Sequence, residues 1–182
     1  MKYFFLVIFF ISFTSKVSAS FKNDIIQNLQ NTQNLSFNFE QNINGELENG
    51  DCVIEYPKKI FCKYDLKNKK ILVSNGRSLV IKTNTSYYIY SIEKTPLNLI
   101  LDKEFLINKI KVLEERYVGN NFINFKFSEN DIEINVFFDK KTHNLIGWQT
   151  KDIYQNLSIT YLFSITKNRS IKNNLFKLPK QN

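Results

Sequence analysis

Two cysteines and a single histidine are the residues of this 182-residue chain best suited to metal or redox chemistry. Cys52 and Cys62 lie in GDCVIEYPKKIFCKYD, in two short apolar runs separated by Tyr-Pro-Lys-Lys. Two cysteines and a remote His143 make a poor zinc site, which usually needs four ligands. If the two runs pair as antiparallel strands, the cysteines lie nearly opposite each other, about 4.5–5.5 Å apart at Cα, which a disulfide tolerates. We therefore predict a Cys52–Cys62 disulfide, with free buried thiols and metal or redox chemistry as the alternatives.

His143 is the starting point for the catalytic alternative. It lies in KKTHNLIG, a turn-like sequence with no serine or cysteine nucleophile motif and no paired metal ligands nearby. We interpret it as a solvated turn residue, because general acid–base and nucleophilic catalysis both need a partner group within reach. The prediction is a protein that is not an enzyme, with no catalytic residue, no metal site and no cofactor.

The first residues, MKYFFLVIFFISFTSKVSAS, indicate export. A basic Lys2 precedes an apolar run that is too short for a bilayer, which needs about 20 residues, and small residues end at Ala19. We expect a cleaved signal peptide over residues 1–19, and Ser20 then offers no thiol for lipid attachment. The remaining residues 20–182 are expected to form a single domain in the periplasm, an oxidising compartment that favours disulfides.

The charge of the mature chain argues against one class of partner. Without Lys2 and Lys16, 23 basic residues face 17 acidic ones, a net charge of +6. The lysines are scattered, and neither a glycine-rich phosphate loop nor a nucleic-acid-binding motif is present, so we expect no nucleic-acid partner. The charge suits anionic headgroups or simple solubility.

Alternating apolar and polar residues dominate the chain and predict strands. In LSFNFEQNI the residues Leu35, Phe37 and Phe39 face one way and the polar residues between them face the other. Later segments repeat this pattern with short connections, such as the turn-like Ser-Asn-Gly-Arg at residues 74–77. Neighbouring strands should therefore pair in sequence, giving an antiparallel sheet of about nine to eleven strands that curls into a barrel or an open half-barrel.

Two segments have helical spacing instead. Phe21, Ile25 and Leu29 fall on one face of an expected first helix, with Ser20 as its cap. In residues 93–113, Thr95 followed by Pro96 is typical of a helix start, with proline at the first helical position. The apolar residues that follow fit either a helix that completes the core or a lid over a cavity inside the curled sheet.

Several motifs occur together in a familiar order. FNFEQ contains Phe-x-Gln, and GDCVIEYPKKIFCKY resembles a Gly-x-Leu-x-Leu-x-Arg-Pro-x-x-Phe-x-Trp-x-Tyr hairpin. LVSNGRSLVI follows for a Ser-Asp-Gly turn, TPLNLIL for Thr-Pro-x-x-x-Leu-Leu, LIGWQTKD for Leu-x-x-Trp, and LFKLP for Phe-x-Phe-x-Pro. Over nearly all of the mature chain, the sequence resembles the LolA family of periplasmic lipoprotein carriers.

The resemblance implies a mainly β fold with short helices, an unclosed antiparallel half-barrel covered by a helical lid. It implies a protein that takes acylated lipoproteins from an inner-membrane ABC transporter and passes them to an outer-membrane acceptor, shielding their acyl chains in a hydrophobic cavity. We expect this protein to be a monomer. The alternative is a LolA-like periplasmic carrier or binding module for another lipid. The expected lipid-binding residues are Phe37, Phe39, Ile54, Tyr56, Leu79, Ile81, Ile89, Leu97, Ile100, Leu101, Phe105, Leu106 and Trp148.

Two departures from the family pattern concern the hairpin. Tyr56 stands where the family often carries the arginine that can hydrogen-bond the lid, and a phenol has fewer donors and no charge. Tyr56 could still hold a lid carbonyl, and Lys58 or Lys59 could replace the arginine. Cys52 and Cys62 stand where the family has a leucine and a tryptophan, which suggests that packing has been exchanged for a disulfide.

Overall fold

The computed structural model describes residues 21–151 and 156–181. The expected signal peptide, its cleavage site and the Ser20 cap lie outside these residues. The described chain is mainly β, with one eleven-stranded antiparallel sheet and three short α-helices. This confirms the predicted fold class.

The elements follow one another with short connections. In chain order they are α1 (Phe21–Asn31), β1 (Asn34–Ile43), β2 (Glu46–Glu55), β3 (Lys59–Tyr64), β4 (Ile71–Asn75), β5 (Ser78–Lys82), β6 (Tyr87–Ser91), η1 (Ile92–Lys94), α2 (Leu97–Ile100), α3 (Lys103–Val112), β7 (Arg116–Val118), β8 (Phe122–Glu129), β9 (Ile132–Asp139), β10 (Leu145–Lys151) and β11 (Leu157–Lys167).

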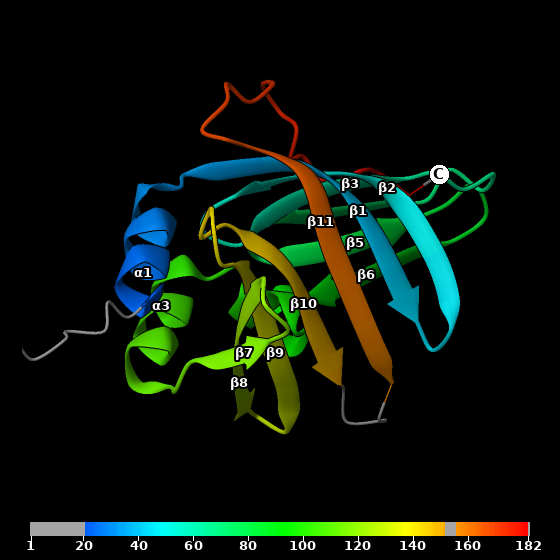
Figure 1. The fold of residues 1–182 in the computed structure, drawn as a ribbon. Helices are drawn as coiled ribbons and strands as arrows, with labels where there is room; N and C mark the ends of the chain where they lie inside the picture. Colours follow the sequence, from blue (N-terminus) through cyan, green and yellow to red (C-terminus); the bar gives the residue numbers. More distant parts are fainter. Residues whose placement is uncertain (1–20, 152–155, 182) are drawn as a thin grey trace, which may run out of the picture.

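The sheet is ordered β6-β5-β4-β3-β2-β1-β11-β10-β9-β8-β7, and every pairing is between sequence neighbours except that of β1 with β11. Strands β6 and β7 occupy its two edges and do not pair with each other, so the sheet is an open half-barrel. Figure 1 shows the curl: β3 to β6 form one side and β7 to β10 the other, joined through β2, β1 and β11. The helical segment 92–112 connects the two edge strands.

Strand alternation decides which residues face the inside of the curl. Because directly opposed residues in an antiparallel pair share a face, Phe37 lies on the same face as Cys52 and Cys62, its partners across two ladders. The next strand adds Leu72 opposite Cys62. These concave-face residues are buried and belong to one hydrophobic core.

The expected first helix is confirmed as α1. Ile25 and Leu29 are buried and Phe21 packs against the core, as their spacing predicted. Figure 1 shows α1 beside α3 at one end of the sheet. The Asn28 side chain donates to the His143 carbonyl at 2.6 Å, which ties α1 to the β9–β10 turn.

The interpretation of His143 as a solvated turn residue was correct for the backbone and only partly correct for the side chain. His143 lies in the turn between β9 and β10 with a φ of 57°. Its side chain is only 24% exposed, with the ring 5.9 Å from the Phe21 ring and the buried Nε2 4.0 Å from the Asp24 carboxylate. Tertiary packing of α1 against the turn, which the local sequence does not encode, covers this side chain.

The segment around Pro96 is divided differently from the prediction. Pro96 occupies the capping position before α2 rather than the first helical position, and Thr95 does not cap α2. The Thr95 hydroxyl donates to the Ile92 carbonyl at 2.8 Å, so it closes the preceding turn η1 instead. The longer helix is α3, whose cap is Asp102: its side chain accepts from the Phe105 amide at 3.1 Å.

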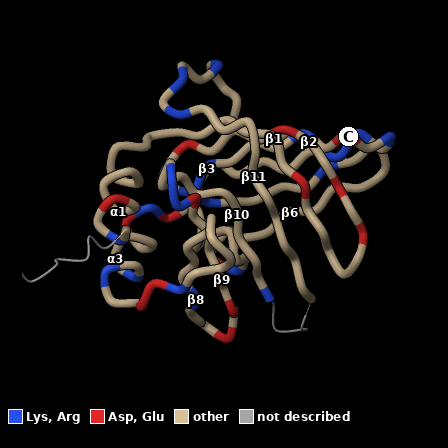
Figure 2. Tube along the Cα trace, viewed as in Figure 1, with Lys and Arg blue, Asp and Glu red and all other residues tan. Residues whose placement is uncertain are grey.

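The outer face of the sheet is partly covered by the carboxyl-terminal segment. The Lys59 ammonium lies 5.8 Å from the centre of the Phe176 ring, and the Tyr87 hydroxyl donates to the Pro179 carbonyl at 3.1 Å. Figure 2 shows that most charged residues lie on turns and at the periphery, leaving the middle of the strands largely uncharged.

Candidate functional site

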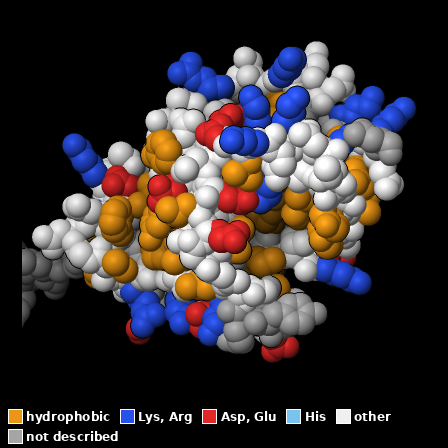
Figure 3. Space-filling view, turned by 90° about the vertical axis from the view of Figure 1, so that its right-hand side faces the viewer, with side chains coloured by type: hydrophobic (Ala, Val, Ile, Leu, Met, Phe, Trp, Pro, Cys, Tyr) orange, Lys and Arg blue, Asp and Glu red, His pale blue; other side chains and the backbone are white. Residues whose placement is uncertain are grey.

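A cavity of about 220 Å³ lies on the concave face, between the sheet and the segment that contains α2. Its wall is mostly apolar, with aromatic side chains from β1 and β10 and aliphatic ones from β3 to β5 and α2. Figure 3 shows hydrophobic side chains recessed within a hollow of one face of the molecule. The lining residues are Phe37, Phe39, Gln41, Cys52, Ile60, Cys62, Tyr64, Leu72, Leu79, Ile81, Thr95, Pro96, Leu97, Ile100, Trp148, Thr150, Ser158 and Thr160.

The structure places seven of the expected lipid-binding residues in this wall. They come from β1, β5, α2 and β10, four elements that only the curl of the sheet brings together. They are Phe37, Phe39, Leu79, Ile81, Leu97, Ile100 and Trp148.

The other six expected residues lie outside the wall. Ile54, Leu101 and Leu106 are fully buried core residues. Phe105 is half-buried and packs against Phe127, with ring centres 5.9 Å apart.

Ile89 is on the opposite face of the sheet. It pairs with Val80, whereas its neighbours Tyr88 and Tyr90 pair with the cavity-lining Ile81 and Leu79. The Ile89 side chain is 57% exposed. It therefore does not share the cavity with the other expected residues.

Sequence reasoning missed the wall contributed by β3, β4 and the ends of β10 and β11. The alternation of strand residues could have identified part of this wall. Ile60, Cys62 and Tyr64 occupy every second position of β3, and Gln41 continues the spacing of Phe37 and Phe39 in β1. Gln41 was overlooked because it is polar. The missed residues other than the cysteines are Gln41, Ile60, Tyr64, Leu72, Thr95, Pro96, Thr150, Ser158 and Thr160.

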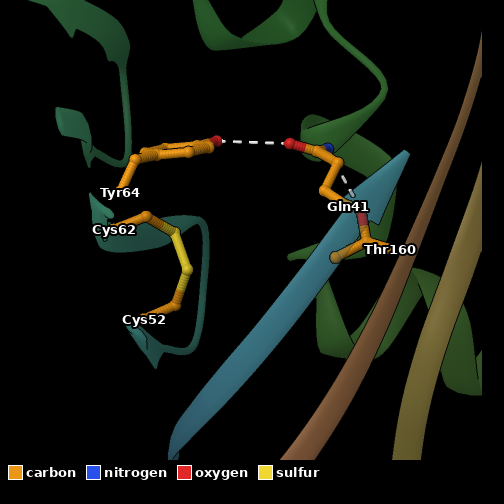
Figure 4. Close-up of a disulfide and its surroundings, with 5 residues drawn as sticks. All are labelled: Gln41, Cys52, Cys62, Tyr64 and Thr160. Atoms are coloured by element: carbon orange, nitrogen blue, oxygen red, sulfur yellow. Dashed lines mark hydrogen bonds between the residues drawn. A yellow bond between two sulfur atoms is a disulfide. The ribbon is translucent and has the colours of Figure 1, made fainter. Parts of the chain in front are cut away.

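The predicted disulfide is confirmed. Cys52 and Cys62 are directly opposed in the β2–β3 ladder, with Cα atoms 4.1 Å apart, and they are bonded to each other. Figure 4 shows the bond beside Tyr64 and opposite Gln41 and Thr160. The disulfide is therefore part of the cavity wall as well as a crosslink between two strands.

A second hollow, of about 690 Å³, adjoins the cavity. Leu79, Ile81, Thr95 and Pro96 line both spaces. The start of the helical segment therefore separates the two hollows. Of the expected lid, residues 95–97 and Ile100 contact the cavity, and we use the name lid for residues 95–101.

The lid is held at its far end by Lys58, in the turn between β2 and β3. The Lys58 backbone amide donates to the Leu101 carbonyl at 2.9 Å. The Lys58 ammonium lies 3.2 Å from the Asp102 carboxylate, and both side chains are a little under one-third exposed. The buried Ser74 hydroxyl donates to the Lys58 carbonyl at 2.8 Å and fixes the turn.

Tyr56 does not hold the lid. Burial raises the pKa of its phenol, and within the described residues its hydroxyl has no hydrogen-bond partner. The suggestion that this phenol binds a lid carbonyl was therefore wrong. Lys58 makes the contact instead, because the turn directs both its amide and its ammonium towards the end of the lid.

Two other features, a metal-ligand cluster and a membrane-spanning helix, are not found in the described part of the chain. Residues 21–151 and 156–181 contain no group of three or more histidine, cysteine or acidic residues placed to hold a metal ion. In the same residues, no helix is long and apolar enough to cross a bilayer.

An open half-barrel with an apolar cavity beneath a tethered helical segment is typical of proteins that bind apolar ligands. The family model "Outer membrane lipoprotein carrier protein LolA" matches residues 30–179. The chain belongs to the LolA family. No curated protein matches the chain.

Three solved structures are similar to this chain at very low sequence identity, and the first of them supports the fold. An uncharacterized conserved protein from Thermus thermophilus is 6% identical, with a TM-score of 0.52 over 87% of this chain and 93% of that chain. A LolA superfamily protein from Nitrosomonas europaea is 6% identical, with a TM-score of 0.44 over 86% and 97%. A putative outer membrane lipoprotein-sorting protein domain from Vibrio parahaemolyticus is 8% identical, with a TM-score of 0.48 over 85% and 95%.

Proposed function

We propose that this protein is a periplasmic carrier that shields the acyl chains of lipoproteins in its cavity and moves them from the inner to the outer membrane. The observation that carries the proposal is the apolar cavity on the concave face, covered by a lid that Lys58 tethers. Family membership supports the same function.

The energetics of acyl chains explain why such a cavity is needed. Exposing one CH₂ group to water costs about 0.8 kcal/mol, so a sixteen-carbon chain costs on the order of 12 kcal/mol. A lipoprotein with three chains therefore cannot cross an aqueous compartment unprotected. A wall of Phe37, Phe39, Trp148 and aliphatic residues removes most of that cost by replacing water around the chains.

The cavity is too small for this cargo as it stands. Its volume of about 220 Å³ is below the roughly 300–1,000 Å³ of ordinary ligand sites. We infer that the lid is closed here and that it moves when the cargo is loaded. Displacing Thr95 and Pro96 would join the cavity to the adjoining hollow, since both residues line the two spaces.

A closed state that competes with cargo also assists release. When only a fraction of the molecules is open, the apparent affinity falls in proportion to that fraction. Loading by an inner-membrane ABC transporter and unloading to an outer-membrane acceptor then need no covalent chemistry in the carrier. We propose that it acts as a monomer, without a nucleic-acid partner.

The direct test is native mass spectrometry of the mature protein purified from the periplasm, followed by extraction of any bound lipid. Bound triacylated lipoprotein would support the proposal. Another lipid alone, with no lipoprotein even after incubation with the inner-membrane transporter, would favour the alternative of a carrier for that lipid.

A pair of variants links the result to the cavity. Leu97→Glu places a carboxylate in the wall and should reduce lipoprotein release from spheroplasts, whereas Leu47→Glu changes a side chain that is 60% exposed and should leave release unchanged. Normal release by a folded Leu97→Glu variant would contradict the proposed role of the cavity.

A further inference from the structure

One end of the cavity carries a cluster of hydrogen-bonding side chains that its hydrophobic function does not explain. Gln41 lies near the end of β1, and Ser158 and Thr160 lie near the start of β11. All three line the cavity together with Tyr64. Figure 4 shows Gln41 between Tyr64 and Thr160.

Two hydroxyl groups of this cluster, those of Ser158 and Thr160, accept hydrogen bonds but do not use their own hydrogens. The Gln41 amide nitrogen donates to the Ser158 hydroxyl and to the Thr160 hydroxyl, each at 3.1 Å, which uses both of its hydrogens. The two hydroxyls therefore act as acceptors, and each keeps its own hydrogen. In the described part of the chain, neither hydroxyl donates to a protein acceptor.

Burial makes these remaining hydrogens significant. Thr160 is only 3% exposed, and a buried donor without an acceptor costs free energy that a ligand acceptor would recover. The Gln41 oxygen accepts from the Tyr64 hydroxyl at 3.4 Å, and within the described residues it receives no hydrogen bond from Ser158 or Thr160. The cluster therefore offers hydrogen-bond donors to the cavity.

Because the cluster lies at one end of the cavity, the two ends differ in polarity. Along β3, Ile60 lies two residues from the Lys58 tether, whereas Tyr64 lies four residues further on, or about 13 Å in an extended strand. Ile60 and Leu79 lie at the tether end, because both are opposite Ser74, whose hydroxyl donates to the Lys58 carbonyl. The opposite end carries the polar cluster and, next to it, the Lys70–Glu48 ion pair at 2.6 Å, with the Lys70 ammonium 4.2 Å from the centre of the Tyr64 ring.

We propose that Ser158 and Thr160, positioned by Gln41, form a subsite for the carbonyl oxygens of acyl esters or amides. This inference rests on the proposed function, because it names which part of an acylated ligand lies at which end of the cavity. Hydrocarbon tails lie towards Ile60 and the lid, and the linkage to the polar part of the ligand lies at the β1–β11 end. The subsite distinguishes acyl chains, which carry carbonyl oxygens, from alkyl chains of the same length.

A pair of matched ligands tests the subsite. Dioctanoylglycerol has two ester carbonyls, and dioctylglycerol ether has the same chains without them. Their affinities for the mature protein are measured by displacement of a fluorescent fatty acid. We expect the ester to bind about tenfold more tightly, the upper part of the range for one net hydrogen bond.

Variants separate a ligand contact from a structural one. The Ser158→Ala/Thr160→Val variant should lose the preference for the ester and keep the affinity for the ether. Thr166→Val removes a hydroxyl from the same strand that donates to the Ser36 carbonyl outside the cavity, and it should keep the preference.

Two results would overturn the subsite while leaving the carrier function intact. One is equal affinity of the unmodified protein for ester and ether, and the other is a preference that survives in Ser158→Ala/Thr160→Val. Failure of both ligands to bind would instead overturn the carrier function, and the subsite with it.

Discussion

Replacing Lys58 by methionine should increase the population of molecules with an open lid without unfolding the lid. The substitution removes the ion pair with Asp102, whose charged atoms lie 3.2 Å apart, and retains the backbone hydrogen bond from residue 58 to the Leu101 carbonyl. Methionine keeps most of the aliphatic stem, so packing changes little. The variant therefore isolates the electrostatic part of the tether.

The expected size of the effect follows from the exposure of the pair. Both side chains are a little under one-third exposed, which places the contribution at about 1 kcal/mol, the upper end for a partly solvated ion pair. Since 1.4 kcal/mol corresponds to a factor of ten, the open population should rise about fivefold. Apparent affinity for an acyl ligand should rise by the same factor, because it is proportional to the open fraction.

Two measurements check this prediction. Hydrogen exchange of the residue 58 amide reports opening directly, because that amide donates to the Leu101 carbonyl in the closed state, and it should become about fivefold faster. Displacement of a fluorescent fatty acid reports the change in affinity.

Neighbouring residues supply the controls. Lys59→Met removes an ion pair with Glu55 that lies within the hairpin and should change neither measurement. Asp102→Asn keeps an oxygen that can cap α3 and loses only the charge, so it should match Lys58→Met. The double variant should add little, since both substitutions remove one interaction. Unchanged exchange and affinity in Lys58→Met, or equal changes in Lys59→Met, would refute the assignment of Lys58 as the tether.

Three further predictions concern stability. Replacing both cysteines by alanine should lower the free energy of unfolding by about 2–3 kcal/mol, because the disulfide no longer restricts the unfolded chain; urea denaturation measures this, and an unchanged midpoint would contradict it. Gly50→Ala should lower the urea midpoint by an amount equivalent to about 1–3 kcal/mol, since a Cβ there would meet the Lys63 carbonyl. At Gly45 a Cβ meets open space, so Gly45→Ala should lower the midpoint less despite the positive φ of that residue. Leu101→Glu should destabilise the fold by about 3–5 kcal/mol because it buries an unpaired charge. Leu97→Glu in the cavity wall should reduce ligand binding with a smaller loss of stability, and equal urea midpoints for the two variants would contradict this difference.

The local features were those that the sequence predicted best. The period-two pattern of β1, the turn at residues 74–77 and the buried face of α1 all depend on residues close together in the chain. The disulfide also followed from local pairing, because a short hairpin places Cys52 opposite Cys62. The family resemblance then indicated the open sheet, which the structure confirms.

Features that depend on distant contacts were harder to predict. Strand β6 reads Tyr-Tyr-Ile-Tyr-Ser, with apolar character on both faces, so its pattern could not place Ile89 on the outer one. Leu101 has the i+4 spacing that puts it on the same helical face as Leu97 and Ile100, yet only Leu97 and Ile100 line the cavity. His143 was interpreted as solvated because nothing near it in the sequence shows that α1 packs over the turn.

The sequence by itself therefore determined the strands, the first helix, the hairpin crosslink and the family, because each follows from neighbouring residues or from the order of motifs. Only the tertiary structure decided that Lys58 rather than Tyr56 tethers the lid, since that depends on where the turn directs its donors. It also decided that Gln41 meets Thr160, 119 residues away in the chain, because β1 pairs with β11 across the middle of the sheet. Alternation assigns a residue to a face, and the curl of the sheet determines what that face encloses.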